Sequence, residues 1–263
     1  MNRMRPDREQ LRKEISLYAR RLMLSSRVSE LCQTEASPRQ EQFLYRVLSE
    51  EMARREGSRK TRLLNRAGFP VLKGFEEYDF SEVRFPPAFS REELLSGAFI
   101  REKKNLVLYG GVGTGKTHMG IALGVLACQA NQRVRFHTVT ELVLKLADAY
   151  RSGTLERLVR ELKELDLLIL DEWGYVPVDR EGSQLLFRVI ADSYESKSLV
   201  LTTNLEFSKW GGIFTDEQMA AAMIDRLVHH GHLIMFGAKS YRMSHALMRQ
   251  QGSASEGRKK ESA

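Results

Sequence analysis

Glycines, a lysine and a threonine crowd into residues 106–117, which read LVLYGGVGTGKT. The stretch matches the pattern G-x-x-x-x-G-K-[ST]. Glycines allow a tight turn whose N–H groups converge, and a helix that begins beside the turn adds its positive N-terminal end. In such a loop the lysine neutralises the β- and γ-phosphates and the next hydroxyl holds Mg²⁺. The pattern therefore predicts a nucleotide triphosphate site made of Gly110, Gly111, Val112, Gly113, Thr114, Gly115, Lys116, Thr117 and His118.

Two carboxylates follow the apolar run LLIL at 167–170. Such a run is typical of a strand buried on both faces, and parallel α/β sheets bind ligands at the carboxyl ends of their strands. We expect Asp171 to hold Mg²⁺ through water and Glu172 to polarise the water that attacks the γ-phosphate. Taken alone, this pair is better interpreted as a solvated turn, but its place about fifty residues after the loop favours catalysis.

Three further residues, an asparagine and two arginines, are of types that often take part in ATPase sites. Asn204 ends a predicted strand at 198–203, and its amide is expected to orient the attacking water, although asparagine also favours ordinary turns. Arg226, in MIDRL, is a candidate for a finger that reaches a neighbouring subunit, and Arg242, in SYRM, for a contact to the phosphates of its own subunit. On spacing alone, a surface arginine is the better interpretation of both.

Strands and helices alternate around these residues. We predict a parallel sheet with helices on both faces, in an ATPase core at 101–249. The preceding connector is expected at 69–100 and a polar, disordered tail at 250–263. The predicted strands lie at about 105–109, 133–138, 166–170, 198–203 and 232–236.

Residues 1–68 are predicted to form a small helical domain. Apolar residues recur at helical spacing from residue 11, and again after a break at Pro38. Gly57 and Ser58 are expected to interrupt the second helix, and Gly68 to end this region.

The positive charge of the chain is concentrated in this helical domain. The net charge is +7, and residues 1–66 account for all of it, with 16 Lys and Arg against 9 Asp and Glu. A basic surface of this density predicts contact with the phosphate backbone of DNA. The alternative is a solvated helix face on which glutamates alternate with the basic residues. The expected DNA contacts are Arg54, Arg55, Arg59, Lys60, Arg62 and Arg66.

Composition narrows the class of protein. The 263 residues are 42% apolar, which is typical of a soluble globular chain. No apolar run is long enough to span a membrane, and the first ten residues lack the apolar core of a secretion signal. Cys32 and Cys128 lie far apart, so we expect buried thiols rather than a disulfide or metal site. A cytoplasmic location is expected.

Several segments together resemble the IstB-like transposition helper ATPases, AAA+ proteins related to the DnaC-type helicase loaders. The resemblance covers about residues 5–249, and the combination of NRAGFP and DEWGY is more specific than the phosphate loop. The matching segments are RLLNRAGFP (62–70), LKGFEEYDF (72–80), GGVGTGKTHM (110–119), LLILDEWGY (167–175), LTTN (201–204) and DRL (225–227).

The resemblance implies an AAA+ core with five parallel strands in the order 5-1-4-3-2. It implies that Arg226 is the trans-acting finger, that Arg242 is a second sensor, and that Tyr78 and Phe80 line the adenine pocket. It further implies ATP and Mg²⁺ as cofactors, a weak ATPase that depends on assembly, a homo-oligomer on duplex DNA, a partner transposase and a location near the bacterial nucleoid. Only about 27 residues follow the last predicted strand, so we expect the C-terminal lid to be reduced or absent.

Two other functions fit the same nucleotide chemistry. A helicase loader of the DnaC type is expected to present an apolar anchor to its helicase, whereas a DNA-binding arm is expected to be basic. Residues 1–66 have both features, and the excess of charge favours DNA. The third interpretation is a nucleotide-binding signalling module that does not bind DNA.

Overall fold

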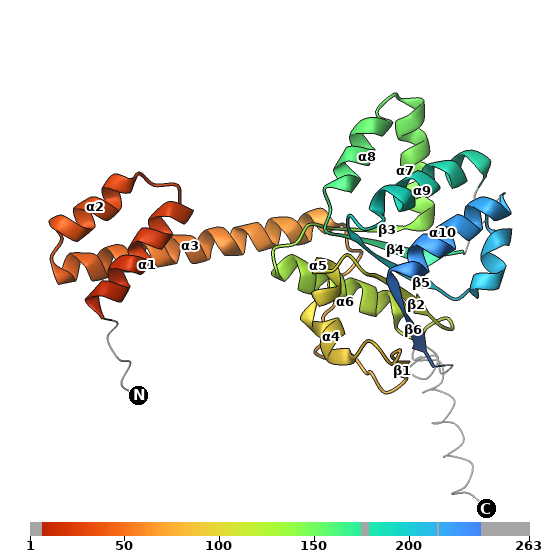
Figure 1. Ribbon diagram of the computed structural model, residues 1–263, viewed down its shortest axis with the longest axis horizontal. Helices are drawn as coiled ribbons and strands as arrows, with labels where there is room; N and C mark the ends of the chain where they lie inside the picture. The colour runs from red at the N-terminus through yellow and green to blue at the C-terminus, as the bar shows by residue number, and fades with distance from the viewer. Residues whose placement is uncertain (1–6, 175–178, 215, 238–263) are drawn as a thin grey trace, which may run out of the picture. The chain divides into compact units, whose positions relative to one another are not determined.

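The computed structural model of the chain describes residues 7–174, 179–214 and 216–237. The chain divides into two compact units, Met1–Arg62 and Leu63–Ala263 (Figure 1). Arg242, the segment in which a reduced lid was expected and the tail at 250–263 lie outside the described residues.

In residues 7–62, the described part of the first unit, the regular elements are all helices, as predicted. Helix α2 is capped by Ser25, whose side chain accepts a hydrogen bond from the Arg27 N–H, and α3 has Pro38 at its first position. A small apolar core joins the helices, with Leu11 and Ile15 from α1, Cys32 from α2 and Leu48 from α3 among its members. The helices are α1 (Arg8–Arg21), α2 (Ser26–Thr34) and α3 (Pro38–Ala67).

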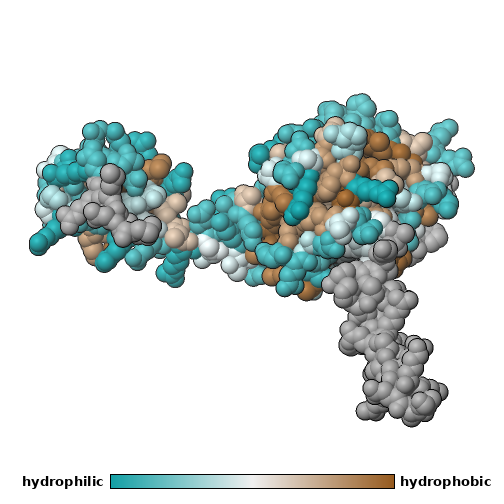
Figure 2. Space-filling model, turned by 90° about the horizontal axis from the view of Figure 1, so that it is seen from below, coloured by the Kyte–Doolittle hydropathy of each residue, from teal (hydrophilic) through white to brown (hydrophobic). Residues whose placement is uncertain are grey.

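Helix α3 runs for 30 residues without interruption, so the prediction of a break at Gly57 and Ser58 is wrong. A glycine inside a helix costs about 1 kcal/mol relative to alanine, which the good helix formers on both sides offset. Residues 53–59 are all exposed, and the visible face of the segment that joins the two units is mostly hydrophilic (Figure 2). The helix does end as predicted, because Gly68 takes a left-handed conformation with φ of +77°.

A buried carboxylate ties α3 to α1. The side chain of Glu41 is fully buried, and its oxygens accept hydrogen bonds from Arg8 Nε at 2.9 Å and Arg12 Nε at 2.8 Å. These hydrogen bonds lower the pKa of Glu41, and the one from Arg8 has the largest effect. The interaction stabilises the first unit only while Glu41 is ionised.

Replacing Glu41 by glutamine is expected to destabilise the first unit by about 1 kcal/mol, a value reduced because both arginines are partly exposed. Because folding lowers the pKa of Glu41, the wild-type advantage is full above the ordinary pKa of 4.5 and is lost as the pH falls through the folded value. Hydrogen exchange of α1 peptides, measured at neutral and acid pH, checks this. Glu50→Gln, at an exposed pair 3.9 Å from Arg46, is the control. Equal exchange in both variants at neutral pH would contradict the expectation.

The second unit is built on a six-stranded sheet in the order β1-β6-β2-β5-β4-β3. The five parallel strands lie in the order 5-1-4-3-2 that the family resemblance implies. The sixth strand corrects the prediction of five, because β1 pairs antiparallel with β6 through Val83 and Phe236. The strands are β1 (Val83–Arg84), β2 (Asn105–Tyr109), β3 (Val134–Thr138), β4 (Leu167–Trp173), β5 (Ser198–Thr203) and β6 (Gly231–Phe236).

Alternate residues of the central strands enter two separate cores, which explains their continuous apolar sequences. On β4, Ile169 packs with α4, α5 and α6, whereas Leu168 and Leu170 pack with α7, α9 and α10 (Figure 1). No helix in the described residues is both long and apolar enough to cross a membrane. The helices are α4 (Arg91–Ser96), α5 (Ala98–Arg101), α6 (Lys116–Gln129), α7 (Val139–Arg151), α8 (Leu155–Lys163), α9 (Arg180–Ser193), the 3-10 helix η1 (Phe207–Gly212) and α10 (Glu217–His229).

The predicted connector at 69–100 contributes to the second core. Helix α4 begins with a capping box in which Ser90 and Glu93 bond each other's backbone N–H. Leu94, Phe99 and Ile100 are buried against β2 and α6. This segment therefore belongs to the second unit.

Candidate functional site

The glycine-rich loop joins the end of β2 to the start of α6. Gly113 and Gly115 have φ values of +79° and +98°, which residues with a side chain rarely adopt. A Cβ atom on Gly115 would also lie 2.9 Å from the hydroxyl oxygen of Tyr78. Val112 is exposed, and Thr114 donates a hydrogen bond to the Gly111 carbonyl across the loop.

Lys116 is the first residue of α6 and is almost fully buried. Its ammonium group donates to the carbonyl oxygens of Gly110, at 2.8 Å, and Gly111. A positive charge therefore lies inside the curve of the loop, beside the N-terminus of a helix. Both features favour an anion.

Thr117 and Asp171 meet at the carboxyl end of the sheet. The Thr117 hydroxyl donates to Asp171 Oδ1 at 3.0 Å, and Asp171 is 5% exposed. The same oxygen accepts a second hydrogen bond from the hydroxyl of Thr202 on β5. The structure thus brings together two residues that are 54 positions apart in the sequence, as the metal-site prediction requires.

Glu172 lies at an irregularity in β4. The pairing of β4 with β5 shifts between Leu170 and Trp173, and Glu172 has a φ of +63°. Its N–H donates to the Thr202 hydroxyl at 3.1 Å, and its side chain is exposed. Bulges of this kind redirect side chains next to active sites. Here the bulge leaves Asp171 buried and Glu172 open to solvent.

An aromatic cluster borders the other side of the loop. Tyr78 donates a hydrogen bond to the Gly115 carbonyl at 3.3 Å, and the centre of its ring lies 4.8 Å from that of Phe80. Burial raises the pKa of Tyr78, so the hydroxyl keeps its proton and remains a donor. The ring of His118 packs on Tyr78 at 4.9 Å, and its Nε2 lies 2.9 Å from the Gly74 carbonyl oxygen.

The remaining predicted residues lie on other elements. Asn204 is exposed directly after β5. Arg226, near the end of α10, donates to the Ala222 carbonyl and lies over the ring of Phe187 on α9 at 5.1 Å. The predicted DNA contacts Arg54, Arg55, Arg59, Lys60, Arg62 and Arg66 all lie along α3, and Arg66 belongs to the second unit.

Sequence reasoning missed two polar residues that hold this arrangement together. Thr202 contacts both Asp171 and Glu172. Asn105, buried at the start of β2, accepts from the Leu199 N–H and donates to the carbonyls of Arg226 and Leu227, which fixes the end of α10. The available signal was the presence of uncharged polar residues inside otherwise apolar strands.

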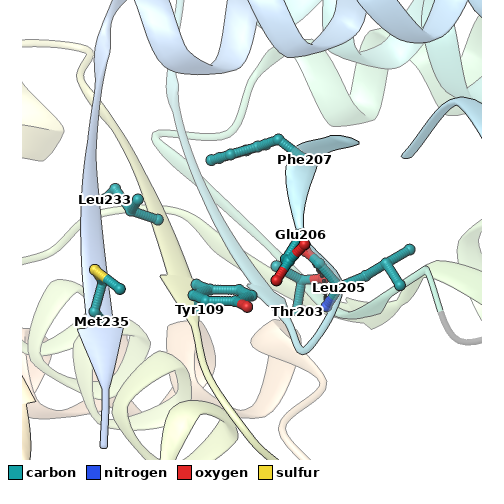
Figure 3. A pocket seen from close by; sticks show the side chains of 7 residues that line it. All are labelled: Tyr109, Thr203, Leu205, Glu206, Phe207, Leu233 and Met235. Carbon is teal, nitrogen blue, oxygen red and sulfur yellow. Dashed lines mark hydrogen bonds between the residues drawn. The ribbon is translucent and has the colours of Figure 1, made fainter. Parts of the chain in front are cut away.

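A mostly apolar pocket adjoins the site at the ends of β2, β5 and β6. In Figure 3 the ring of Tyr109 lies between Met235 on one side and Leu205 on the other. Phosphate oxygens need N–H groups and cations, so this pocket is not the phosphate site, although Tyr109 directly precedes Gly110. Its lining residues are Tyr109, Thr203, Leu205, Glu206, Phe207, Leu233 and Met235.

Known proteins resemble this chain in sequence. The family model described as IstB-like ATP binding protein matches residues 21–249. A Pseudomonas aeruginosa protein, named as an ATP-binding protein of insertion sequence IS21, is 38% identical over 205 residues, which are 77% of this chain and 76% of the relative. A Geobacillus stearothermophilus protein, named for insertion sequence IS5376, is 34% identical over 202 residues, which are 77% and 80% of the two chains.

A solved structure shows the fold. The crystal structure of DnaI is 18% identical, covers 69% of this chain and 93% of its own, and gives a TM-score of 0.50. The chain thus shares its fold with DnaI, and a short antiparallel strand, β1, lies at one edge of its sheet. From its sequence match and the geometry of its glycine loop, the chain belongs to the IstB-like ATP binding protein family.

Proposed function

We propose that this protein is a DNA-binding transposition helper that assembles on target duplex DNA with ATP, hydrolyses the ATP and recruits a partner transposase. The convergence of Thr117, Asp171 and Glu172 beside the glycine loop is the observation that carries the ATPase activity. The names of the relatives, which are ATP-binding proteins of insertion sequences, support transposition as the process.

The residues present fit Mg²⁺, which prefers oxygen ligands. The Thr117 hydroxyl and the Asp171 carboxylate are 3.0 Å apart, which supports a shared ion. Thr117 would hold the ion directly and Asp171 would hold it through water. Mg²⁺, when bound, neutralises charge on the phosphates. Lys116 then exchanges the carbonyls of Gly110 and Gly111 for phosphate oxygens.

The other residues of the site act on water and on the base. Glu172, exposed beside buried Asp171, polarises the attacking water and accepts its proton. Asn204 orients that water from the end of the neighbouring strand. Tyr78 and Phe80, packed against the loop with His118, line the site for adenine.

Hydrolysis requires a second copy of the chain in this proposal. Arg226 is partly exposed near the end of α10, where Asn105 fixes the backbone of its helix. Its guanidinium leaves the ring of Phe187 to reach the γ-phosphate of a neighbouring subunit. ADP lacks that phosphate, so hydrolysis weakens the assembly and times its release from DNA.

The continuity of α3 supports the DNA contact. Arg55, Arg59 and Arg62 recur at intervals of four and three residues, which places them along one side of a helix. All three are exposed, and the side chain of Arg55 pairs with Glu51 at 2.7 Å. We expect the arginines of this row to contact backbone phosphates, which carry no sequence information, so binding should show little sequence preference.

Replacing Arg59 and Arg62 by alanine together is expected to weaken duplex binding roughly tenfold or more, because two phosphate contacts are lost. The slope of log affinity against log salt concentration is negative, and its magnitude should decrease by about 2. Titrations of two unrelated duplexes with a slowly hydrolysed ATP analogue, over a range of salt, measure both quantities.

The control is Arg46→Ala, an exposed arginine on another side of α3. If the double variant binds with the wild-type affinity and slope, α3 is not the DNA contact.

A pull-down with ATP tests which protein is the partner. The partner transposase is expected to bind, and capture of the replicative helicase alone would favour the loader function.

A further inference from the structure

Thr202 connects the two acidic residues of the site through a single hydroxyl group. It is 2% exposed and lies in β5, opposite Leu108 of β2. Its hydroxyl donates a hydrogen bond to Asp171 Oδ1 and accepts one from the Glu172 N–H at 3.1 Å. Both the donor and an acceptor position of this hydroxyl are therefore used by the site.

The backbone that presents Glu172 needs such support. A glutamate with a φ of +63° is in a conformation that side chains disfavour. The Thr202 hydroxyl accepts a hydrogen bond from the N–H of Glu172. The Thr203 hydroxyl donates one to the carbonyl of Trp173, the residue after Glu172, at 2.9 Å. Two successive threonines of β5 therefore hold the bulge from the neighbouring strand.

The Asp171 carboxylate depends on the same hydroxyl. Oδ1 accepts from both Thr117 and Thr202, and Thr117 is also the residue placed to hold Mg²⁺. We assign the ion to Thr117 and not to Thr202, so the hydrogen bond from Thr202 would keep the carboxylate oriented when the ion binds, as outer-shell partners of metal sites do.

We infer that Thr202 is a positioning residue for ATP hydrolysis, which orients the Asp171 carboxylate and the Glu172 backbone together. The inference rests on the proposed ATPase function. The methyl group of Thr202 has a separate role, because it packs toward α6, 3.8 Å from where a Cβ of Gly120 would lie. Packing and hydrogen bonding by this side chain are therefore separable by substitution.

Two substitutions of Thr202, by valine and by serine, test this inference. Thr202→Val keeps the shape and removes the hydroxyl, and Thr202→Ser keeps the hydroxyl and removes the methyl. We expect Thr202→Val to lower kcat for ATP hydrolysis roughly 10- to 100-fold. Affinity for ATP, measured with a fluorescent analogue, should stay within about threefold because the loop is unchanged. Thr202→Ser should restore most of the rate. A packing role predicts the opposite order, with valine close to wild type and serine impaired.

Hydrogen exchange gives a readout that does not depend on turnover. The Glu172 amide is expected to exchange faster in Thr202→Val than in wild type or Thr202→Ser, because its acceptor is lost. Unchanged exchange, or wild-type kcat in the valine variant, overturns the inference alone. Wild-type protein that binds ATP and never hydrolyses it, even when concentrated on DNA, overturns the proposed function and the inference together.

Discussion

Replacing Glu172 by glutamine is expected to slow ATP hydrolysis roughly 100-fold or more, while ATP affinity changes by less than about threefold. Glutamine has the same shape but cannot accept a proton from the attacking water. The side chain of Glu172 is exposed and its backbone is held by Thr202, so the substitution leaves the bulge intact. Phosphate release under steady-state conditions and titration with a fluorescent nucleotide give the two quantities.

The same variant should remain on DNA after wild type has dissociated, because in the proposed function hydrolysis times release. Glu206→Gln is a matched control, since Glu206 is also an exposed acid near the end of a central strand and has no assigned role in the chemistry. Its hydrolysis rate is expected to equal that of wild type. Normal turnover by Glu172→Gln would exclude Glu172 as the catalytic base.

Replacing Lys116 by alanine is expected to weaken ATP binding roughly 100-fold or more, the effect of losing charge-assisted hydrogen bonds worth about 3 kcal/mol. The lysine is almost fully buried with its ammonium at the carbonyls of Gly110 and Gly111, so the substitution removes a positive charge from inside the loop. In the proposed function ATP drives assembly, so the variant should also fail to form complexes on DNA. Equilibrium titration with a fluorescent ATP analogue measures the loss.

Lys104→Ala is the control for charge, because Lys104 pairs with Glu102 just before β2, at the opposite end of that strand from the loop. Its nucleotide affinity is expected to match wild type. Wild-type affinity in Lys116→Ala would show that the loop does not hold the triphosphate.

The sequence predicts the parts of this structure that depend on local pattern. The apolar runs locate all five parallel strands, and the glycine loop lies between a strand and a helix as expected. Strand ends then identify Asp171, Glu172 and Asn204 as neighbours, because parallel strands end at one edge. In the structure the Thr202 hydroxyl contacts both Asp171 and Glu172, and the roles of Asp171, Glu172 and Asn204 stay predictions.

The features that sequence reasoning missed depend on distant residues or small energies. Strand β1 has two residues and exists only because β6 offers an edge. The bulge at Glu172 and the contacts of Asn105 join segments far apart in the chain, so no local pattern reveals them. Gly57 predicts a break in the helix, but the helix formers on both sides outweigh the small cost of one glycine, and α3 continues.

The mass of the protein on a duplex tests ATP-dependent assembly most directly. Wild-type protein is mixed with duplex DNA and Mg²⁺, and the mass of the complexes is measured with a slowly hydrolysed ATP analogue, with ADP and without nucleotide. We expect multi-subunit complexes with the analogue and few or none in the other two samples. In a separate hydrolysis assay, we expect Arg226→Ala to hydrolyse ATP no faster per subunit when it is concentrated than when it is dilute. Protein that stays monomeric and does not bind the duplex with saturating analogue and Mg²⁺ would contradict the proposal.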